Sequence, residues 1–180
     1  NVFDTRAGLN IVEQSAEGGG VSLVANWAIN DAFSLKSVTA YREDESTTPI
    51  DFDSLPSGDL DVPAIYENDQ LSQEFLLNYS GDKLNGVAGI YYLDASASTV
   101  FDVLLANTGD LIGLPGLNAQ TFGDVGTETW AIFGDFSYEV TPEFTVTVGA
   151  RYTEDERTSQ VLRRTFISGF SDFFGGAGIP

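Results

Sequence analysis

Cysteine, histidine and methionine are all absent from this chain of 180 residues. Without cysteine there is no disulfide framework and no thiolate nucleophile. Without cysteine and histidine the chain cannot build serine or cysteine triads, the common zinc sites or haem ligation from its own side chains. Paired carboxylates are enough for a glycosidase, but nothing in the sequence places two of them in an apolar pocket. We therefore expect no enzyme activity and no organic cofactor.

Basic residues are scarce as well, with 8 Lys and Arg against 27 Asp and Glu, for a formal charge of -19. Such a surface repels a phosphate backbone, so nucleic acid is not expected as a partner. Hydrophobic residues nevertheless make up 42% of the chain and charged residues only 19%. This composition is too apolar for a disordered acidic tail, and the chain is expected to fold or to assemble.

Long apolar runs are also missing. No stretch approaches the roughly 18 apolar residues of a transmembrane helix, so any membrane insertion must use β-strands. The length fits one domain, residues 1–180. No signal segment with a charged start and an apolar core opens the chain at Asn1, and we interpret the sequence as a piece of a longer protein.

What the chain does contain is period-two alternation of apolar and polar residues, in pairs of segments joined by short turns. The pattern predicts hairpins over about residues 20–42, 69–93 and 128–153. The connections between them, about residues 43–66 and 94–126, are rich in Gly, Pro, Asp and Ser and are predicted as long loops. The fold class is therefore all-β, an antiparallel meander of long hairpins.

Two architectures fit such a meander. A soluble β-sandwich would bury the aromatic residues in a core, and alternation alone does not separate it from a membrane barrel. Short turns that alternate with long loops favour the barrel, because outer-membrane barrels have short turns at one rim and long loops at the other. Segments long enough for the 9–11 residues of a spanning strand, with aromatics toward their ends, point the same way.

Four sequence blocks carry a more specific signal: Ser37–Glu43, Leu71–Leu77, Gly86–Asp94, and Thr129–Tyr138 followed by Val148–Glu156. In this order they closely resemble successive barrel strands of TonB-dependent outer-membrane receptors. The resemblance covers about residues 20–157. The meander expected for this chain therefore resembles part of an outer-membrane β-barrel.

The resemblance implies a barrel of about 22 strands closed by a plug, in the bacterial outer membrane, surrounded by lipid. It also implies import of siderophores, vitamins or oligosaccharides with energy transmitted through TonB. The chain departs from the family in length, because about seven predicted strands cannot close such a barrel. Nothing in it resembles the plug or the TonB-contacting segment, so TonB is a partner only through absent parts. The resemblance assigns no substrate-binding residue.

A sheet cut from a barrel has two unpaired edges, which are templates for further strands. An alternative function follows, in which the chain is a structural subunit that pairs with copies of itself and forms an extracellular fibre or oligomer, in barrel-like or repacked form. The high negative charge opposes close stacking of identical strands, because it places like charges in rows.

Four carboxylates, Asp51, Asp53, Asp59 and Asp61, fall within one predicted loop. Hard cations such as calcium prefer oxygen ligands of this kind, and these residues are the candidate metal ligands. The spacing does not follow the EF-hand order, and a solvated acidic loop is the simpler interpretation. Two further acidic runs, Glu43–Glu45 and Glu154–Glu156, are interpreted as the wet starts of loops.

Overall fold

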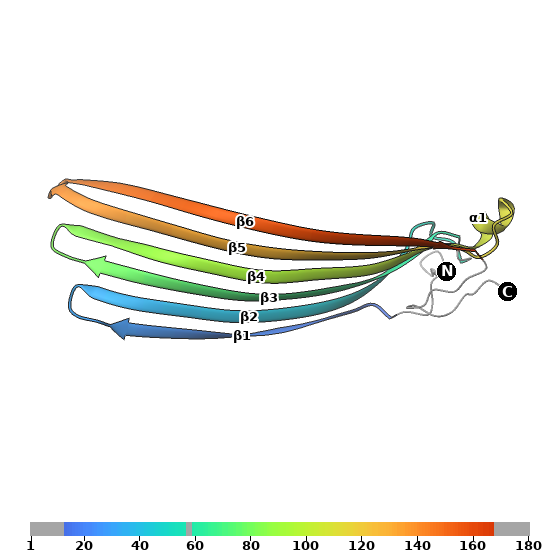
Figure 1. Ribbon diagram of the computed structural model, residues 1–180, viewed down its shortest axis with the longest axis horizontal. Helices are drawn as coiled ribbons and strands as arrows, with labels where there is room; N and C mark the ends of the chain where they lie inside the picture. The colour runs from blue at the N-terminus through green and yellow to red at the C-terminus, as the bar shows by residue number, and fades with distance from the viewer. Residues whose placement is uncertain (1–12, 57–58, 168–180) are drawn as a thin grey trace, which may run out of the picture.

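The computed structural model describes residues 13–56 and 59–167. This part of the chain forms six strands and one short helix (Figure 1). In chain order the elements are β1 (Ser15–Ala28), β2 (Phe33–Asp51), β3 (Asp61–Ser80), β4 (Leu84–Leu105), α1 (Ala106–Leu111), β5 (Leu117–Thr141) and β6 (Phe144–Phe166).

Each strand pairs antiparallel with the next one along the chain, in the order β1 to β6. The turns after β1, β3 and β5 lie at one end of the sheet, and the longer connections after β2 and β4 lie at the other (Figure 1). In the first turn the Asn30 Oδ1 accepts hydrogen bonds from the backbone N–H groups of Ala32 and Phe33, at 3.0 and 2.9 Å. A side chain that mimics the backbone in this way is a common turn former. The predicted fold class, an all-β antiparallel meander, is confirmed.

The strands are longer than the alternation predicts. The predicted hairpins lie within β1–β2, β3–β4 and β5–β6, but most of the two predicted loops is also strand, namely residues 43–51, 61–66, 94–105 and 117–126. The acidic runs Glu43–Glu45 and Glu154–Glu156 therefore lie inside β2 and β6 and do not begin loops. The true connections are residues 52–60 and 106–116, and the strands in the described part of the chain number six, not about seven.

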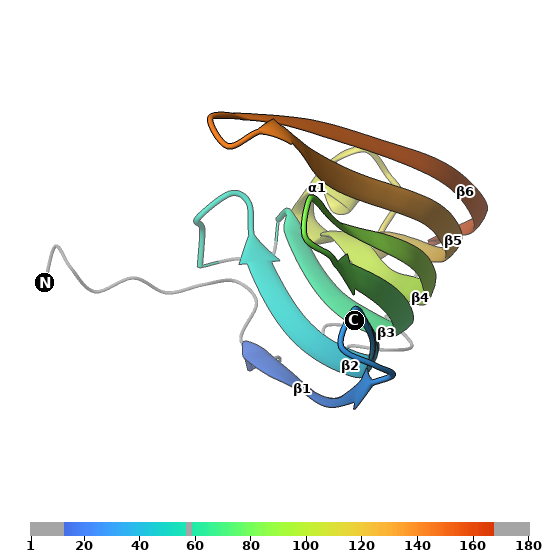
Figure 2. The ribbon, with the colours of Figure 1, turned by 90° about the vertical axis from the view of Figure 1, so that its left-hand side faces the viewer.

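Among residues 13–56 and 59–167 the sheet is a single curved layer with no second sheet packed against it (Figure 2). Among the described residues the buried hydrophobic side chains are those of three alanines, Ala64, Ala119 and Ala131. Large apolar side chains are instead exposed, for example Leu23 at 69% and Val148 at 67%. A domain normally buries its apolar face against another element, so this sheet is built to meet something outside the described chain.

Most of the exposed apolar side chains of the strands lie on one face of the sheet. Directly paired residues of antiparallel strands point to the same side, so the register assigns each side chain to a face. We call the set of apolar and aromatic residues on this face, over the half of the sheet nearest the short turns, the apolar band. Its members include Val21, Leu23, Trp27, Phe33, Leu35, Tyr41, Leu71, Phe75, Leu77, Tyr79, Leu84, Ile90, Tyr92, Trp130, Ile132, Phe136, Tyr138, Val146, Val148 and Tyr152.

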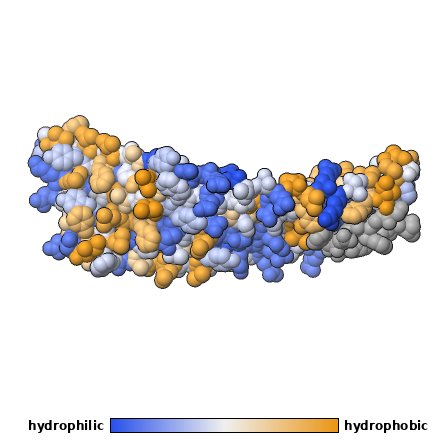
Figure 3. All heavy atoms as spheres, viewed as in Figure 1, coloured by the Kyte–Doolittle hydropathy of each residue, from blue (hydrophilic) through white to orange (hydrophobic). Residues whose placement is uncertain are grey.

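The space-filling view shows apolar side chains gathered at the end with the short turns and hydrophilic ones across the middle of the sheet (Figure 3). Within the described ranges no helix is long and apolar enough to cross a membrane.

Candidate membrane-facing wall and acidic belt

The apolar band ends abruptly in charge. On three strands a tyrosine of the band is followed two residues later, on the same face, by an acidic residue: Tyr41 by Glu43, Tyr92 by Asp94 and Tyr152 by Glu154. We call the acidic residues that follow the band on this face the acidic belt: Glu17, Glu43, Glu45, Glu67, Asp69, Asp94, Glu128, Glu154 and Glu156. A row of amphipathic rings next to a row of charges is the order found at a membrane–water boundary.

This boundary crosses the strands obliquely. The row of directly paired residues that starts at Tyr41 on β2 crosses β3, β4 and β5 and reaches β6 at Glu156. The tyrosine that marks the boundary on β6 is instead Tyr152, four residues nearer the short turn. Four residues span about 13 Å along a strand, and four interstrand spacings span about 19 Å. The boundary is therefore inclined by about 35° to the hydrogen-bonded rows, close to the strand tilt of about 35–45° in outer-membrane barrels.

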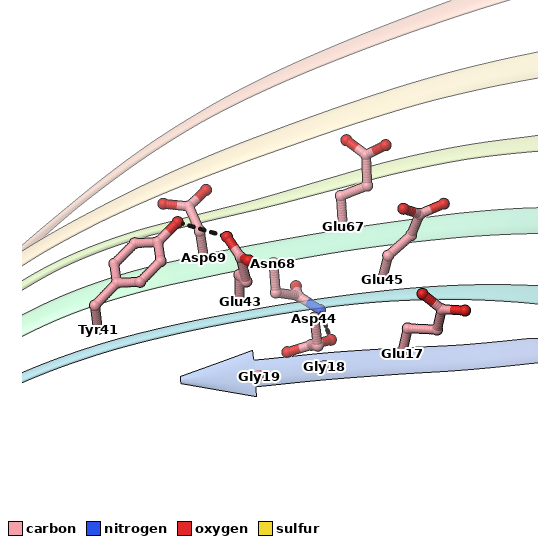
Figure 4. A pocket seen from close by; sticks show the side chains of 10 residues that line it. All are labelled: Glu17, Gly18, Gly19, Tyr41, Glu43, Asp44, Glu45, Glu67, Asn68 and Asp69. Carbon is pink, nitrogen blue, oxygen red and sulfur yellow. Dashed lines mark hydrogen bonds between the residues drawn. The ribbon is translucent and has the colours of Figure 1, made fainter. Parts of the chain in front are cut away.

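Over β1 to β3 the acidic belt borders a shallow hollow of about 540 Å³ (Figure 4). The carboxylates of Glu43 and Asp69 belong to directly paired residues, as do those of Glu45 and Glu67. The Tyr41 hydroxyl donates a hydrogen bond to Glu43 at 2.9 Å. Like charges directly opposite each other destabilise a strand pair, so the belt costs stability in the isolated sheet.

Replacing Glu67 with lysine is expected to stabilise the sheet by about 0.2–1 kcal/mol, because the repulsion with Glu45 becomes attraction. Glu67→Gln, which only removes the repulsion, should give a smaller gain. The measurement is urea unfolding of the detergent-solubilised chain at low and high sodium chloride. A lysine variant no more stable than the glutamine variant at low salt would contradict the expected attraction across the strands, whereas screening should merge the two at high salt.

The opposite face of the sheet, which we call the polar face, carries most of the positive charge. By register Lys36, Arg42, Arg151, Arg157 and Arg163 lie on it. The Arg151 guanidinium lies over the rings of Phe133 and Tyr91, at 5.3 and 5.8 Å from their centroids. Cation–π contacts of this kind hold a charged side chain flat against the wall. Most of the bases thus lie on the polar face, where acids such as Asp44, Asp135 and Asp155 also lie.

The four candidate metal ligands lie near the end of the sheet away from the short turns, but they do not converge on one point. Asp51 and Asp61 are the last pair of the β2–β3 ladder. Asp53 is already used by the connection between these strands, because its Oδ1 accepts the N–H of Leu55 at 2.8 Å and its Oδ2 that of Leu60 at 2.7 Å. Among residues 13–56 and 59–167 no three or more Asp, Glu, His or Cys side chains form a group that could hold a metal ion. Calcium at these four residues stays a prediction.

Asp61 differs from the other three in its surroundings, with only 2% of its surface exposed. This burial, together with repulsion from Asp51, Asp53 and Asp59, raises the pKa of Asp61 to about 6. The neighbouring carboxylates and the burial therefore both favour the protonated form of Asp61.

The geometry defines a class of structure. A single-layer antiparallel meander with an obliquely crossing apolar band on one face and bases on the other is a sector of an outer-membrane-type β-barrel wall. Residues 3–179 match the family model described as TonB dependent receptor-like, beta-barrel, and the chain belongs to this family. The family is one of receptors and transporters of the bacterial outer membrane, not a class of enzymes.

Solved structures agree on the fold. The crystal structure of the ferric yersiniabactin uptake receptor FyuA from Yersinia pestis matches with a TM-score of 0.63 and 18% identity, over 82% of this chain and 21% of that receptor. The chain thus spans about a fifth of the receptor's length, and at this identity the likeness is one of fold. Pseudomonas aeruginosa OpdQ, with a TM-score of 0.17 and 10% identity over 86% of this chain and 62% of its own, is too dissimilar to carry an argument. No curated protein sequence matches the chain.

Proposed function

We propose that this chain is a sector of the barrel wall of a TonB-dependent receptor that imports a nutrient such as a siderophore, a vitamin or an oligosaccharide. The observation that carries the proposal is the oblique apolar band. A soluble sheet has no reason to limit its apolar residues to a strip inclined to its strands, whereas a tilted barrel wall must do so to keep the strip level with the bilayer.

The height of the band supports contact with outer-membrane lipid. Along β5 the band runs from Trp130 to Val140, a length of about 33 Å at about 3.3 Å per residue. Inclined by about 35°, this length corresponds to a height of about 27 Å, close to the apolar band of about 25 Å on outer-membrane barrels. The residues of β5 before Trp130 then extend the wall beyond the lipid and into water.

The polar face would form part of the inner wall. Its bases, among them Arg42, Arg151 and Arg157, would face the transported molecule or the plug inside the barrel. FyuA is described as a receptor for ferric yersiniabactin uptake, and a metal–siderophore complex is one of the three ligand classes we propose for this chain. Interaction with TonB would be made by parts of the receptor outside this sector.

The open edges of β1 and β6 in the described sheet require partners. In a receptor these partners are further strands of the same barrel, since about 22 strands are needed to close it. The same edges favour a second candidate function, in which copies of the chain pair edge to edge into an extracellular fibre. The rows of acidic residues oppose this arrangement.

Labelling of single cysteines tests the proposal, because these 180 residues contain no cysteine and any cysteine elsewhere in the full reading frame can be replaced with serine. Ile132→Cys lies in the apolar band and Thr158→Cys lies on the same face beyond it. With the full reading frame expressed in a Gram-negative host, a membrane-impermeant maleimide should label Thr158→Cys in intact cells and leave Ile132→Cys unmodified until the membrane is dissolved. Equal labelling of the two positions, together with filaments in electron micrographs, would replace the receptor proposal with the fibre.

A further inference from the structure

A second hollow, of about 390 Å³, lies on the polar face of the sheet. Apart from Asp69 and Ser96, the residues that line it belong to this face by register. The row of directly paired residues that crosses it consists of Arg42 on β2, Gln70 on β3, Ala95 on β4 and Thr127 on β5. We call it the polar-face hollow, and a barrel wall as such has no need of it.

The polar-face hollow lies behind the junction of the apolar band and the acidic belt. Arg42 stands between Tyr41 of the band and Glu43 of the belt, and Ala95 directly follows Asp94 of the belt. Adjacent residues of a strand point to opposite faces, so the hollow lies at the level where the other face passes from apolar to acidic. In the proposed receptor this level is on the inner wall, and dissolved molecules reach it from the end with the long connections.

The hollow exists because its floor is made of alanine. Ala95 and Ala97 are successive residues of β4 on the polar face. They lie between Asn68 and Gln70 on one neighbouring strand and Thr127 on the other. Short side chains between two rows of longer ones leave a trough about two interstrand spacings wide, or about 10 Å. A trough of this width accepts a small organic molecule.

Two polar groups of the hollow lack partners. Among residues 13–56 and 59–167 neither the Arg42 guanidinium nor the half-buried Gln70 carboxamide has a hydrogen bond or an ion pair. The acid nearest to Arg42 on this face is already engaged, because Asp44 Oδ2 accepts a hydrogen bond from Asn68 Nδ2 at 2.8 Å (Figure 4). A guanidinium offers donors only and carries a full positive charge, so the group that satisfies it is an anion that accepts hydrogen bonds.

The geometry of the row favours a carboxylate as this anion. Directly paired residues have Cβ atoms about 4.5–5.5 Å apart, so Arg42 and Gln70 can reach the same group. The planar guanidinium matches a carboxylate with two parallel hydrogen bonds, and the Gln70 NH₂ adds a third donor. The Thr127 hydroxyl, about 10 Å from Gln70 across the alanine floor, is placed for a second oxygen of the same molecule.

We propose that the polar-face hollow binds a carboxylate of the imported molecule through the Arg42 guanidinium and the Gln70 amide. This inference rests on the proposed receptor function and narrows its ligand to a molecule that carries a carboxylate. A neutral oligosaccharide is thereby excluded, because its hydroxyls supply no counter-charge to Arg42. The alanine floor sets the size of the group that enters, and Thr127 orients the remainder of the molecule.

The experiment is calorimetric titration of the full receptor in detergent micelles with tricarballylate, a small tricarboxylate, at constant ionic strength. Arg42→Gln should weaken binding at least tenfold, because it removes the counter-charge. Ala95→Leu should weaken it by a similar factor, because it fills the floor without changing charge. The control is Lys36→Gln, which removes the same charge from the same strand and face outside the hollow and should change the affinity less than twofold.

Four outcomes would overturn the proposal. The first is no binding of tricarballylate by the unmodified receptor, which includes the case of an acidic side chain from another part of the receptor filling the hollow. The second is an equal loss of affinity in Arg42→Gln and Lys36→Gln, and the third is unchanged affinity in Ala95→Leu. The fourth is binding of maltotriose, a neutral sugar, as tight as that of tricarballylate. Heat-modifiable mobility identifies a variant that fails to fold.

The cysteine labelling described above separates failure of the hollow from failure of the receptor proposal. Protection of Ile132→Cys with labelling of Thr158→Cys, combined with no binding of tricarballylate, overturns the carboxylate site alone. Equal labelling of the two positions overturns the receptor proposal, and the carboxylate site fails with it.

Discussion

Replacing Val148 with lysine is expected to reduce insertion of the protein into lipid vesicles by about 2–4 kcal/mol, the cost of a lysine on the lipid face near the bilayer midplane. Val148 lies in the middle of the apolar band on β6, paired with Phe136 on β5. Most of its surface is exposed in the sheet, at 67%, so the new ammonium would face the surroundings directly. The measurement is the fraction of protein that acquires the heat-modifiable mobility of a folded barrel, as a function of urea.

The matched control is Thr158→Lys, which adds the same charge on the same face but beyond the acidic belt. It should change insertion by less than about 0.5 kcal/mol, because surface substitutions in water are usually this small. Equal effects of the two variants would show that the apolar band does not meet lipid. A tolerated Val148→Lys would argue that this face of the sheet meets water or another protein surface.

Replacing Gly86 with valine is expected to destabilise the folded wall by about 1–3 kcal/mol. Gly86 lies near the start of β4, close to the turn that joins β3 to β4. The ring of Phe136 from β5 lies over it. A Cβ at this position would overlap the Phe136 ring and would lie 2.6 Å from the carbonyl oxygen of Asp135. The backbone oxygen cannot move without breaking the β4–β5 ladder, so the strain cannot be relieved by a rotamer change alone.

Gly19→Val on β1 is the control, because nothing lies within 4 Å of the Cβ position there. Valine favours strands, so this variant should be neutral or slightly stabilising. The measurement is the urea concentration at the midpoint of unfolding of each variant. A Gly86→Val variant as stable as Gly19→Val would mean that the Phe136 ring does not lie over Gly86.

Sequence patterns located the strands only where the two faces of the sheet differ. Between Trp130 and Val140 apolar and polar residues alternate because one face is the apolar band, and a hairpin is predicted there. Beyond the acidic belt both faces are polar, so residues such as Ser96 and Gly126 show no alternation although they are directly paired in β4 and β5. Such segments become strands because the ladder already formed by their neighbours continues.

The polar residues at the end of the sheet away from the short turns show the same division. The sequence identified Asp51, Asp53, Asp59 and Asp61 because they are close along the chain. Asp102, Asn118 and Gln120 fall in a range predicted as loop, and no spacing in the sequence links them to Asp61. Only the pairing of β3, β4 and β5 brings them beside it.

The sequence by itself determined the all-β class, the position of the hairpins, the absence of nucleophilic and metal-binding cysteine and histidine, and the resemblance to a receptor barrel. These features depend on residue types and on a period of two along one strand. The tertiary structure decided the inclination of the apolar band, the opposition of like charges in the acidic belt and the grouping of Asp61, Asp102, Asn118 and Gln120 on one face of the sheet. All three depend on register between strands, which is set by the burial and pairing of the whole sheet and not by any one segment.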